Sequence, residues 1–225
     1  MNTVKMTSAL CGLAAATLLL GACATPGPAT SWEGLDLVAQ KKFDAVYLKR
    51  DADLVRYTEI MLDPLQVSFD RNWDPRPGYT SLQRADTGRI QRALADEFRK
   101  VFEQTLTADG RFRLVTEAGP ATLHIQPAIV DLYITAPDMS MQTAGRVVTY
   151  TVDPGRMTLA ADFRDGATGT LLGRVVDEKQ GVDKGYLQVT NVVTNTADAR
   201  RAFQQWANAI RDGLDAVKAM APANR

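Results

Sequence analysis

Two stretches of the chain place apolar residues three and four positions apart, which is the spacing of an amphipathic helix. The first extends from about Leu82 to Leu106, with charged side chains on its other faces. The second is predicted to begin at a cap formed by Asn195 or Thr196 and to stop at Pro222. Each helix should bury one stripe against a core. The stripes are Ile90, Leu94, Phe98, Val101, Phe102 and Leu106 in the first helix, and Phe203, Trp206, Ile210, Leu214 and Val217 in the second.

Elsewhere, apolar and polar residues alternate, which predicts strands with one buried face. The clearest alternation spans 157–164, and the turn Asp-Gly-Ala-Thr-Gly at 165–169 predicts a hairpin to a return strand ending near 179. The apolar phase reverses at Pro64 and again beyond Pro127. Because proline cannot donate to a ladder, each reversal predicts a bulge, or an edge position for the first strand. The other expected strands cover 57–69, 112–115 and 123–134, and an edge strand is expected to end a loop over 136–152.

This order of elements predicts an α+β fold: an antiparallel-rich sheet of about five strands with two helices packed on one face, a two-layer sandwich. A single domain would cover residues 57–221. Residues 32–56 mix apolar residues with a charged run and are predicted to be an irregular lead-in. At 45% hydrophobic residues, the chain has enough apolar material to build one core.

The N-terminal 22 residues have the pattern of a signal peptide. Lys5 is their only charge, and Leu10 to Leu20 carries none, a run too short to cross a bilayer comfortably. The sequence Leu20-Gly21-Ala22-Cys23 resembles the bacterial lipobox. That resemblance implies that the chain is cut before Cys23, that the Cys23 thiol is diacylated and that the new amino terminus is acylated.

An acylated Cys23 would begin a short tether at 23–31. Its residues are mostly small and include two prolines, so the tether should stay flexible. Each buried methylene contributes about 0.8 kcal/mol, so two or three acyl chains hold a protein on a membrane. Eight extended residues span at most about 25 Å. Ala24 stands where an Asp would signal inner-membrane retention, so the resemblance implies the outer membrane of a Gram-negative bacterium, with the domain facing the periplasm.

Composition and motifs exclude several function classes. The 26 basic and 26 acidic side chains give no basic excess, so no nucleic-acid partner is expected. His124 is the only histidine, which excludes sites that need two imidazoles, and no GxSxG, GxxxxGK[ST] or GxGxxG motif occurs. The lipobox resemblance implies that Cys11 is lost with the signal peptide and that Cys23 carries the lipid, so no disulfide or cysteine nucleophile is expected in the mature chain. We therefore expect no metal, no cofactor and no enzymatic activity.

Carboxylates leave one catalytic alternative open, because a glycosidase needs only two acids at a fixed separation. Asp131, Asp153, Asp162 and Asp177 lie beside expected strands. The favoured interpretation is that they are solvated or turn residues. His124 is likewise interpreted as a strand residue without a catalytic role.

Four residues are candidate partner contacts. Trp32 and Trp73 lie in segments without periodicity, where an aromatic side chain is available for a partner protein or for lipid head groups. Arg200 and Arg201 belong to a segment, 195–202, that is similar to the peptidoglycan-reading helix of OmpA-like domains. The favoured interpretation of that segment is an ordinary helix start with charged residues.

Several short motifs resemble a bacterial lipoprotein family of unknown function, domain-of-unknown-function family 3313. They are Asp51-Ala52-Asp53-Leu54 followed by Tyr57, the strand Ile60 to Pro64, the segment Asp162 to Gly169, and the Trp206, Arg211, Leu214 helix. The family has no established activity, so the resemblance implies no functional residue.

The sequence thus predicts a lipid-anchored, non-enzymatic envelope lipoprotein whose periplasm-facing domain binds another envelope component. The membrane partner would be reached through the N-terminal acyl chains, and the further partner would be an envelope protein or peptidoglycan. Two alternatives remain: a carboxylate-dependent hydrolase of an envelope polymer, and a peptidoglycan-binding tether that uses Arg200 and Arg201.

Overall fold

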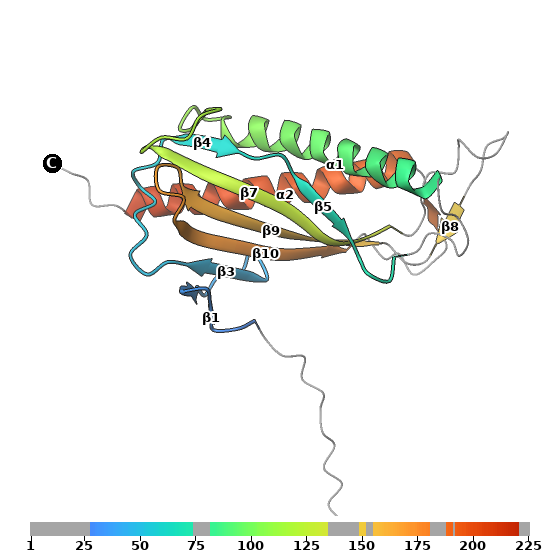
Figure 1. Cartoon of the computed structure of the whole chain (residues 1–225), viewed down its shortest axis with the longest axis horizontal. Helices are drawn as coiled ribbons and strands as arrows, with labels where there is room; N and C mark the ends of the chain where they lie inside the picture. Colours follow the sequence, from blue (N-terminus) through green and yellow to red (C-terminus); the bar gives the residue numbers. More distant parts are fainter. Residues whose placement is uncertain are drawn as a thin grey trace, which may run out of the picture.

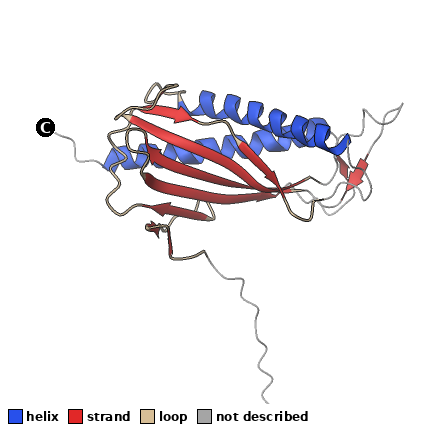
Figure 2. Ribbon diagram, in the orientation of Figure 1, coloured by secondary structure: helices blue, strands red, loops and turns tan. Residues whose placement is uncertain are grey.

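The structure, a computed structural model, describes residues 28–73, 82–134, 149–151, 155–180, 188–190 and 192–220. Two long helices lie on one face of a sheet (Figures 1 and 2). The helices are α1 (Leu82–Leu106) and α2 (Val192–Met220). The strands are β1 (Ser31–Trp32), β2 (Leu35–Leu37), β3 (Ala45–Leu48), β4 (Glu59–Leu62), β5 (Gln66–Phe69), β6 (Arg113–Leu114), β7 (Thr122–Tyr133), β8 (Thr149–Thr151), β9 (Arg156–Asp165), β10 (Leu171–Gln180) and β11 (Gln188–Thr190).

The main sheet has nine strands in the order β1-β2-β3-β10-β9-β7-β4-β6, and β5 also pairs with β7. Pairing is antiparallel from β1 to β7, but β4 and β5 run parallel to β7, and β6 runs parallel to β4. The α+β class and the two helices on one face are confirmed. The prediction of about five antiparallel-rich strands is wrong in number, mainly because β1, β2 and β3 are only two to four residues long and show no clear alternation of apolar and polar residues.

The predicted lead-in at 32–56 is not irregular, since it supplies three of the strands. Glu33 and Gly34 have φ values of 48° and 80°, as a two-residue type I′ hairpin turn between β1 and β2 requires. β3 then pairs with the long strand β10. The edge strand expected at the end of 136–152 is β8, which pairs with β11 in a separate two-stranded sheet.

The two proline positions have different outcomes. At Pro64 the expected strand breaks into β4 and β5. Pro127 stays in register with Ala161 of β9, and the irregularity of β7 falls between Val130 and Tyr133 instead. The carbonyl oxygen of Ile125 accepts a hydrogen bond from the amide of Asp63, so the backbone of Ile125 points toward the β4 side of β7. Because a strand repeats every two residues, the backbone of Pro127 points to the same side. The chain beside Pro127 is the short segment between β4 and β5, which belongs to neither strand. The missing N–H of Pro127 therefore costs no ladder hydrogen bond, and no bulge is needed.

Asp131, at the observed irregularity, has a φ of 54° and an exposed side chain. Val130 is half-buried, and regular alternation would bury the residue that follows it. One extra residue at Asp131 shifts the alternation by one position, so Leu132 is buried instead. The predicted phase reversal is therefore real, but it lies four residues beyond Pro127.

The core fills the space between the helices and the inward face of the sheet. Aromatic rings stack along the helices, with Phe98 and Phe102 centroids 3.8 Å apart and Phe98 and Phe203 centroids 5.4 Å apart. Trp206, 1% exposed, is part of this core as predicted. α2 begins at Val192, earlier than the predicted cap at Asn195 or Thr196, because the segment before the apolar stripe also adopts helical geometry. The strand residues that face the helices include Leu123, Ile125, Ile129, Leu159 and Ala161.

Candidate functional site

The sheet face opposite α1 and α2, which we call the open face, carries a group of polar side chains among smaller apolar ones, whereas the helix-covered face is apolar. The polar side chains that alternation points to this face are His124 and Gln126 on β7, Asp162 and Arg164 on β9, and Arg174 on β10. The register places His124 opposite Arg164, Gln126 opposite Asp162, and Asp162 opposite Arg174. No described helix covers this face.

Hydrogen bonds join these side chains into a network across three strands and the residue that follows β4. Gln126 Nε2 donates to Asp63 Oδ2 at 3.0 Å, and Gln126 Oε1 accepts from Arg164 Nε at 2.7 Å. Asp162 accepts from Arg164 Nη2 at 3.1 Å and from Arg174 Nη2 at 2.7 Å. The side chains of Asp162, Arg164 and Arg174 are 12%, 31% and 16% exposed. They are therefore held in place while part of each remains in contact with solvent.

The histidine sits at one end of this network. His124 Nε2 lies 2.8 Å from Asp63 Oδ1 without forming an aligned hydrogen bond, so the contact is an ion pair only when the imidazole is protonated. The side chain is on a strand, as predicted, although only 17% of it is exposed.

The other end of the network meets the N-terminal hairpin. The Arg174 guanidinium carbon lies 4.0 Å from the centroid of the Trp32 ring, and Trp32 packs edge-on against Tyr47 at 5.8 Å. Hydrogen bonding to Asp162 raises the pKa of Arg174, which keeps its charge fixed in the network. A small apolar cluster of Leu35, Ala45 and Tyr47 anchors the hairpin here.

The four candidate partner contacts lie in different parts of the structure. Trp32 is 39% exposed and lies at the open face. The ring of Trp73 stacks on Phe69 at 4.4 Å, and its Nε1 donates to the carbonyl oxygen of Ile134 at 2.7 Å, so its contacts are within the domain.

The two arginines lie on α2, on the other side of the sheet. Arg200 pairs with Glu97 of α1, which lowers the pKa of Glu97 and raises that of Arg200, and Arg201 pairs with Asp198. Arg200 thus links the two helices, and the side chains of both arginines remain more than half exposed.

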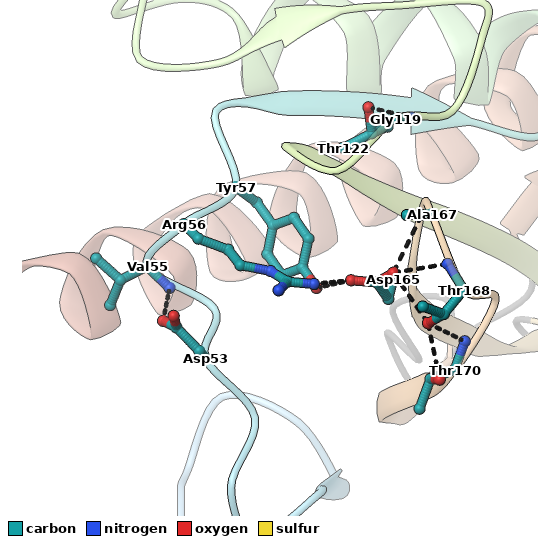
Figure 3. Close-up of polar contacts among 10 residues, drawn as sticks. All are labelled: Asp53, Val55, Arg56, Tyr57, Gly119, Thr122, Asp165, Ala167, Thr168 and Thr170. Atoms are coloured by element: carbon teal, nitrogen blue, oxygen red, sulfur yellow. Dashed lines mark hydrogen bonds and ion pairs between the residues drawn. The ribbon is translucent and has the colours of Figure 1, made fainter.

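Two acids in the described part of the chain are buried, and both accept hydrogen bonds from donors of the domain. Figure 3 shows Asp165, 2% exposed, at the start of the β9–β10 turn. It forms an ion pair with Arg56 and accepts from Tyr57 Oη at 2.7 Å. It also accepts from the amides of Ala167 and Thr168 and from the Thr168 hydroxyl, at 2.8 to 3.0 Å. A carboxylate with this many donors is a structural centre.

The turn is held close to the strand beside it. The amide of Gly166 donates to the carbonyl oxygen of Thr122 at 2.9 Å, and a Cβ at this position would lie 2.7 Å from that oxygen. Only glycine permits this approach.

The second buried acid is Asp177, 3% exposed, beneath α2. Trp206 Nε1 and Lys179 Nζ each lie 2.7 Å from Asp177 Oδ2, and the amide of Asp44 donates to Oδ1 at 3.0 Å. Among the residues described here, no group of three or more His, Cys, Asp or Glu side chains could hold a metal ion. Cys23 and Asp153 lie outside the described residues.

Sequence reasoning identified neither Asp165 as a buried centre nor the network of the open face. The alternation in β7 and β9 indicates which side chains point away from the core, but it does not give the register between strands. Asp165 has the signal of a turn residue, an Asp followed by Gly, and such residues are usually exposed.

Residues 30–210 match the family described as a protein of unknown function, DUF3313, and the chain belongs to this family. No curated protein matches it. Among the described residues, neither α1 nor α2 is long and apolar enough to cross a membrane.

Several solved structures are similar in outline. A PelC dodecamer from Paraburkholderia phytofirmans is 9% identical, with 71% of this chain and 94% of that chain covered and a TM-score of 0.34. A minor lipoprotein from Acinetobacter baumannii is 16% identical, with the same coverage and a TM-score of 0.29. A protein from Xanthomonas campestris is 15% identical, covering 76% and 90%, with a TM-score of 0.33. At such low TM-scores these similarities carry no inference about function.

Proposed function

We propose that the protein is a non-enzymatic envelope lipoprotein, anchored by acyl chains on Cys23 and facing the periplasm from the outer membrane. Its folded domain binds another envelope component through the open face. The observation that supports binding is the network of Asp63, Gln126, Arg164 and Asp162 on a sheet face that no described helix covers.

Preorganisation is the physical reason for choosing this surface. Free arginine and glutamine side chains lose about 0.5–1.5 kcal/mol each when a partner immobilises them. Here Gln126, Arg164 and Arg174 are already held by neighbours, so much of that entropy is lost on folding instead of on binding. Carboxylate, amide and guanidinium groups alternate across the strands, which favours a partner with both hydrogen-bond donors and acceptors.

Site-directed photocrosslinking in intact cells tests the binding surface. Thr158 and Glu178 are paired on the open face of β9 and β10, while Gln104 and Gln205 are exposed on α1 and α2. A photoreactive residue at either strand position is expected to give the same crosslinked product, and the helix positions should not give it. Equal yields from all four positions, or a product from the helices alone, would contradict a binding role for the open face.

The anchor is tested separately by Cys23→Ser. The substitution removes the thiol that would carry the diacyl group, so labelling with a radioactive or clickable fatty acid should be lost completely. The protein should then remain uncleaved or be released in soluble form. Cys11→Ser is the matched control and should label normally. Persistent labelling of the Cys23→Ser protein would show that acylation occurs elsewhere.

A further inference from the structure

The folded domain begins at the strand closest to the proposed anchor. Cys23 precedes Ser31, the first residue of β1, by only eight positions. Eight residues in the extended polyproline conformation span about 25 Å. If Cys23 is acylated, as proposed above, the β1–β2 hairpin therefore begins within about that distance of the bilayer surface. β1 is also the terminal strand of the sheet, at the edge opposite β4 and β6 (Figure 1).

Exposed apolar side chains gather in this same segment. The described residues contain three exposed large hydrophobic side chains: Trp32 at 39%, Val38 at 37% and Val55 at 37%. Two of them belong to residues 31–38, which begin the folded domain. A tryptophan ring is amphipathic, and tryptophans are enriched where membranes meet water.

The hairpin presents Trp32 rigidly. The Arg174 guanidinium stacks on the indole at 4.0 Å, and Tyr47 packs against it edge-on. The type I′ turn at Glu33 and Gly34 fixes the backbone directly after Trp32. The indole therefore has a defined direction relative to the sheet, so a contact between it and the bilayer would orient the whole domain.

The net charge of the N-terminal segment distinguishes electrostatic adsorption to anionic lipid from apolar contact with the bilayer. Residues 31–56 carry five basic side chains (Lys41, Lys42, Lys49, Arg50 and Arg56) and five acidic ones (Glu33, Asp36, Asp44, Asp51 and Asp53). Arg50 and Lys42 are also already paired, with Asp36 and Asp212. A balanced segment has no net attraction to anionic lipid. Contact would depend on the apolar surface of the hairpin and should resist salt.

We propose that the β1–β2 hairpin is a membrane-contacting edge, with the Trp32 indole in the head-group region of a phospholipid bilayer. The sheet then stands on this edge. The open face is left beside the membrane and accessible to a partner, while β4 and β6 point away from the bilayer. This inference rests on the proposed acylation of Cys23.

The test uses the mature lipidated protein in vesicles of phosphatidylethanolamine and phosphatidylglycerol that include lipids brominated near the head group. We expect bromine to quench part of the tryptophan emission, and Trp32→Phe to remove most of that quenching. Trp73→Phe is the control and should keep it, because Trp73 is packed on Phe69. The quenching should change little between about 0.1 M and 1 M salt, which shortens the Debye length from about 10 Å to 3 Å.

Vesicle flotation distinguishes a failure of the membrane-contacting edge from a failure of the acyl anchor. Protein that floats but shows no quenching dependent on Trp32 would overturn the membrane-contacting edge and leave the anchor intact. Protein that does not float would overturn the anchor itself. Quenching that disappears at high salt would also contradict the inference, because it would indicate electrostatic adsorption.

Discussion

Asp165→Ala is expected to lower the free energy of unfolding by about 3 kcal/mol, measured by urea denaturation of the mature domain. The substitution leaves the buried Tyr57 hydroxyl without its acceptor and frees the amides of Ala167 and Thr168. Each unsatisfied buried group costs about 1–3 kcal/mol. Loss of one partner from a buried ion pair costs about 3–5 kcal/mol, but the Arg56 side chain is 49% exposed and can turn to water, so the lower end applies.

The control for this prediction is Asp53→Ala. Asp53 lies just before Arg56 and Tyr57, the two partners of Asp165 from this segment. It accepts a hydrogen bond from the amide of Val55 (Figure 3), but Asp53 is exposed. Its removal should change stability by less than about 0.5–1 kcal/mol. Similar denaturation midpoints for the two variants would show that Asp165 is not the structural centre of the β9–β10 turn.

The parts of the fold that could be predicted are those whose signal is local. The stripe through Phe203, Trp206 and Ile210 and the alternation of β9 depend only on neighbours a few positions away in sequence. The strands β1 and β2 could not be found this way, because two or three residues cannot establish a period of two. Their conformation depends on the strands beside which they lie.

The open face illustrates a second limit. The sequence shows Asp162 and Arg164 alternating with buried residues, so their outward direction was predictable. Their partners Gln126 and Arg174 depend on the register of three strands, and register comes from long-range packing. Trp32 was identifiable as a contact candidate because it lies close to Cys23 without periodicity, but its contact with Arg174, 142 positions further along the chain, was not.

Trp206→Ala should destabilise the domain by about 3–5 kcal/mol, the usual cost of emptying a buried aromatic site. Trp206 is 1% exposed and packs beside Phe203, with ring centroids 6.0 Å apart. Its removal would open a cavity beneath α2 and also take away the indole N–H that donates to Asp177. Far-UV circular dichroism during urea denaturation is the appropriate measurement, because the substitution removes a fluorophore.

Trp206→Phe separates these two contributions. Phenylalanine keeps much of the apolar volume but cannot donate to Asp177, which would retain Lys179 and the amide of Asp44. Leaving one hydrogen bond of a buried carboxylate unmade should cost about 1–3 kcal/mol, in addition to a smaller packing loss. Trp32→Phe is the matched control, since that ring is 39% exposed, and it should cost less than about 1 kcal/mol. If Trp206→Phe were as mild as Trp32→Phe, the hydrogen bond to Asp177 would contribute little, and the role of Trp206 would be packing alone.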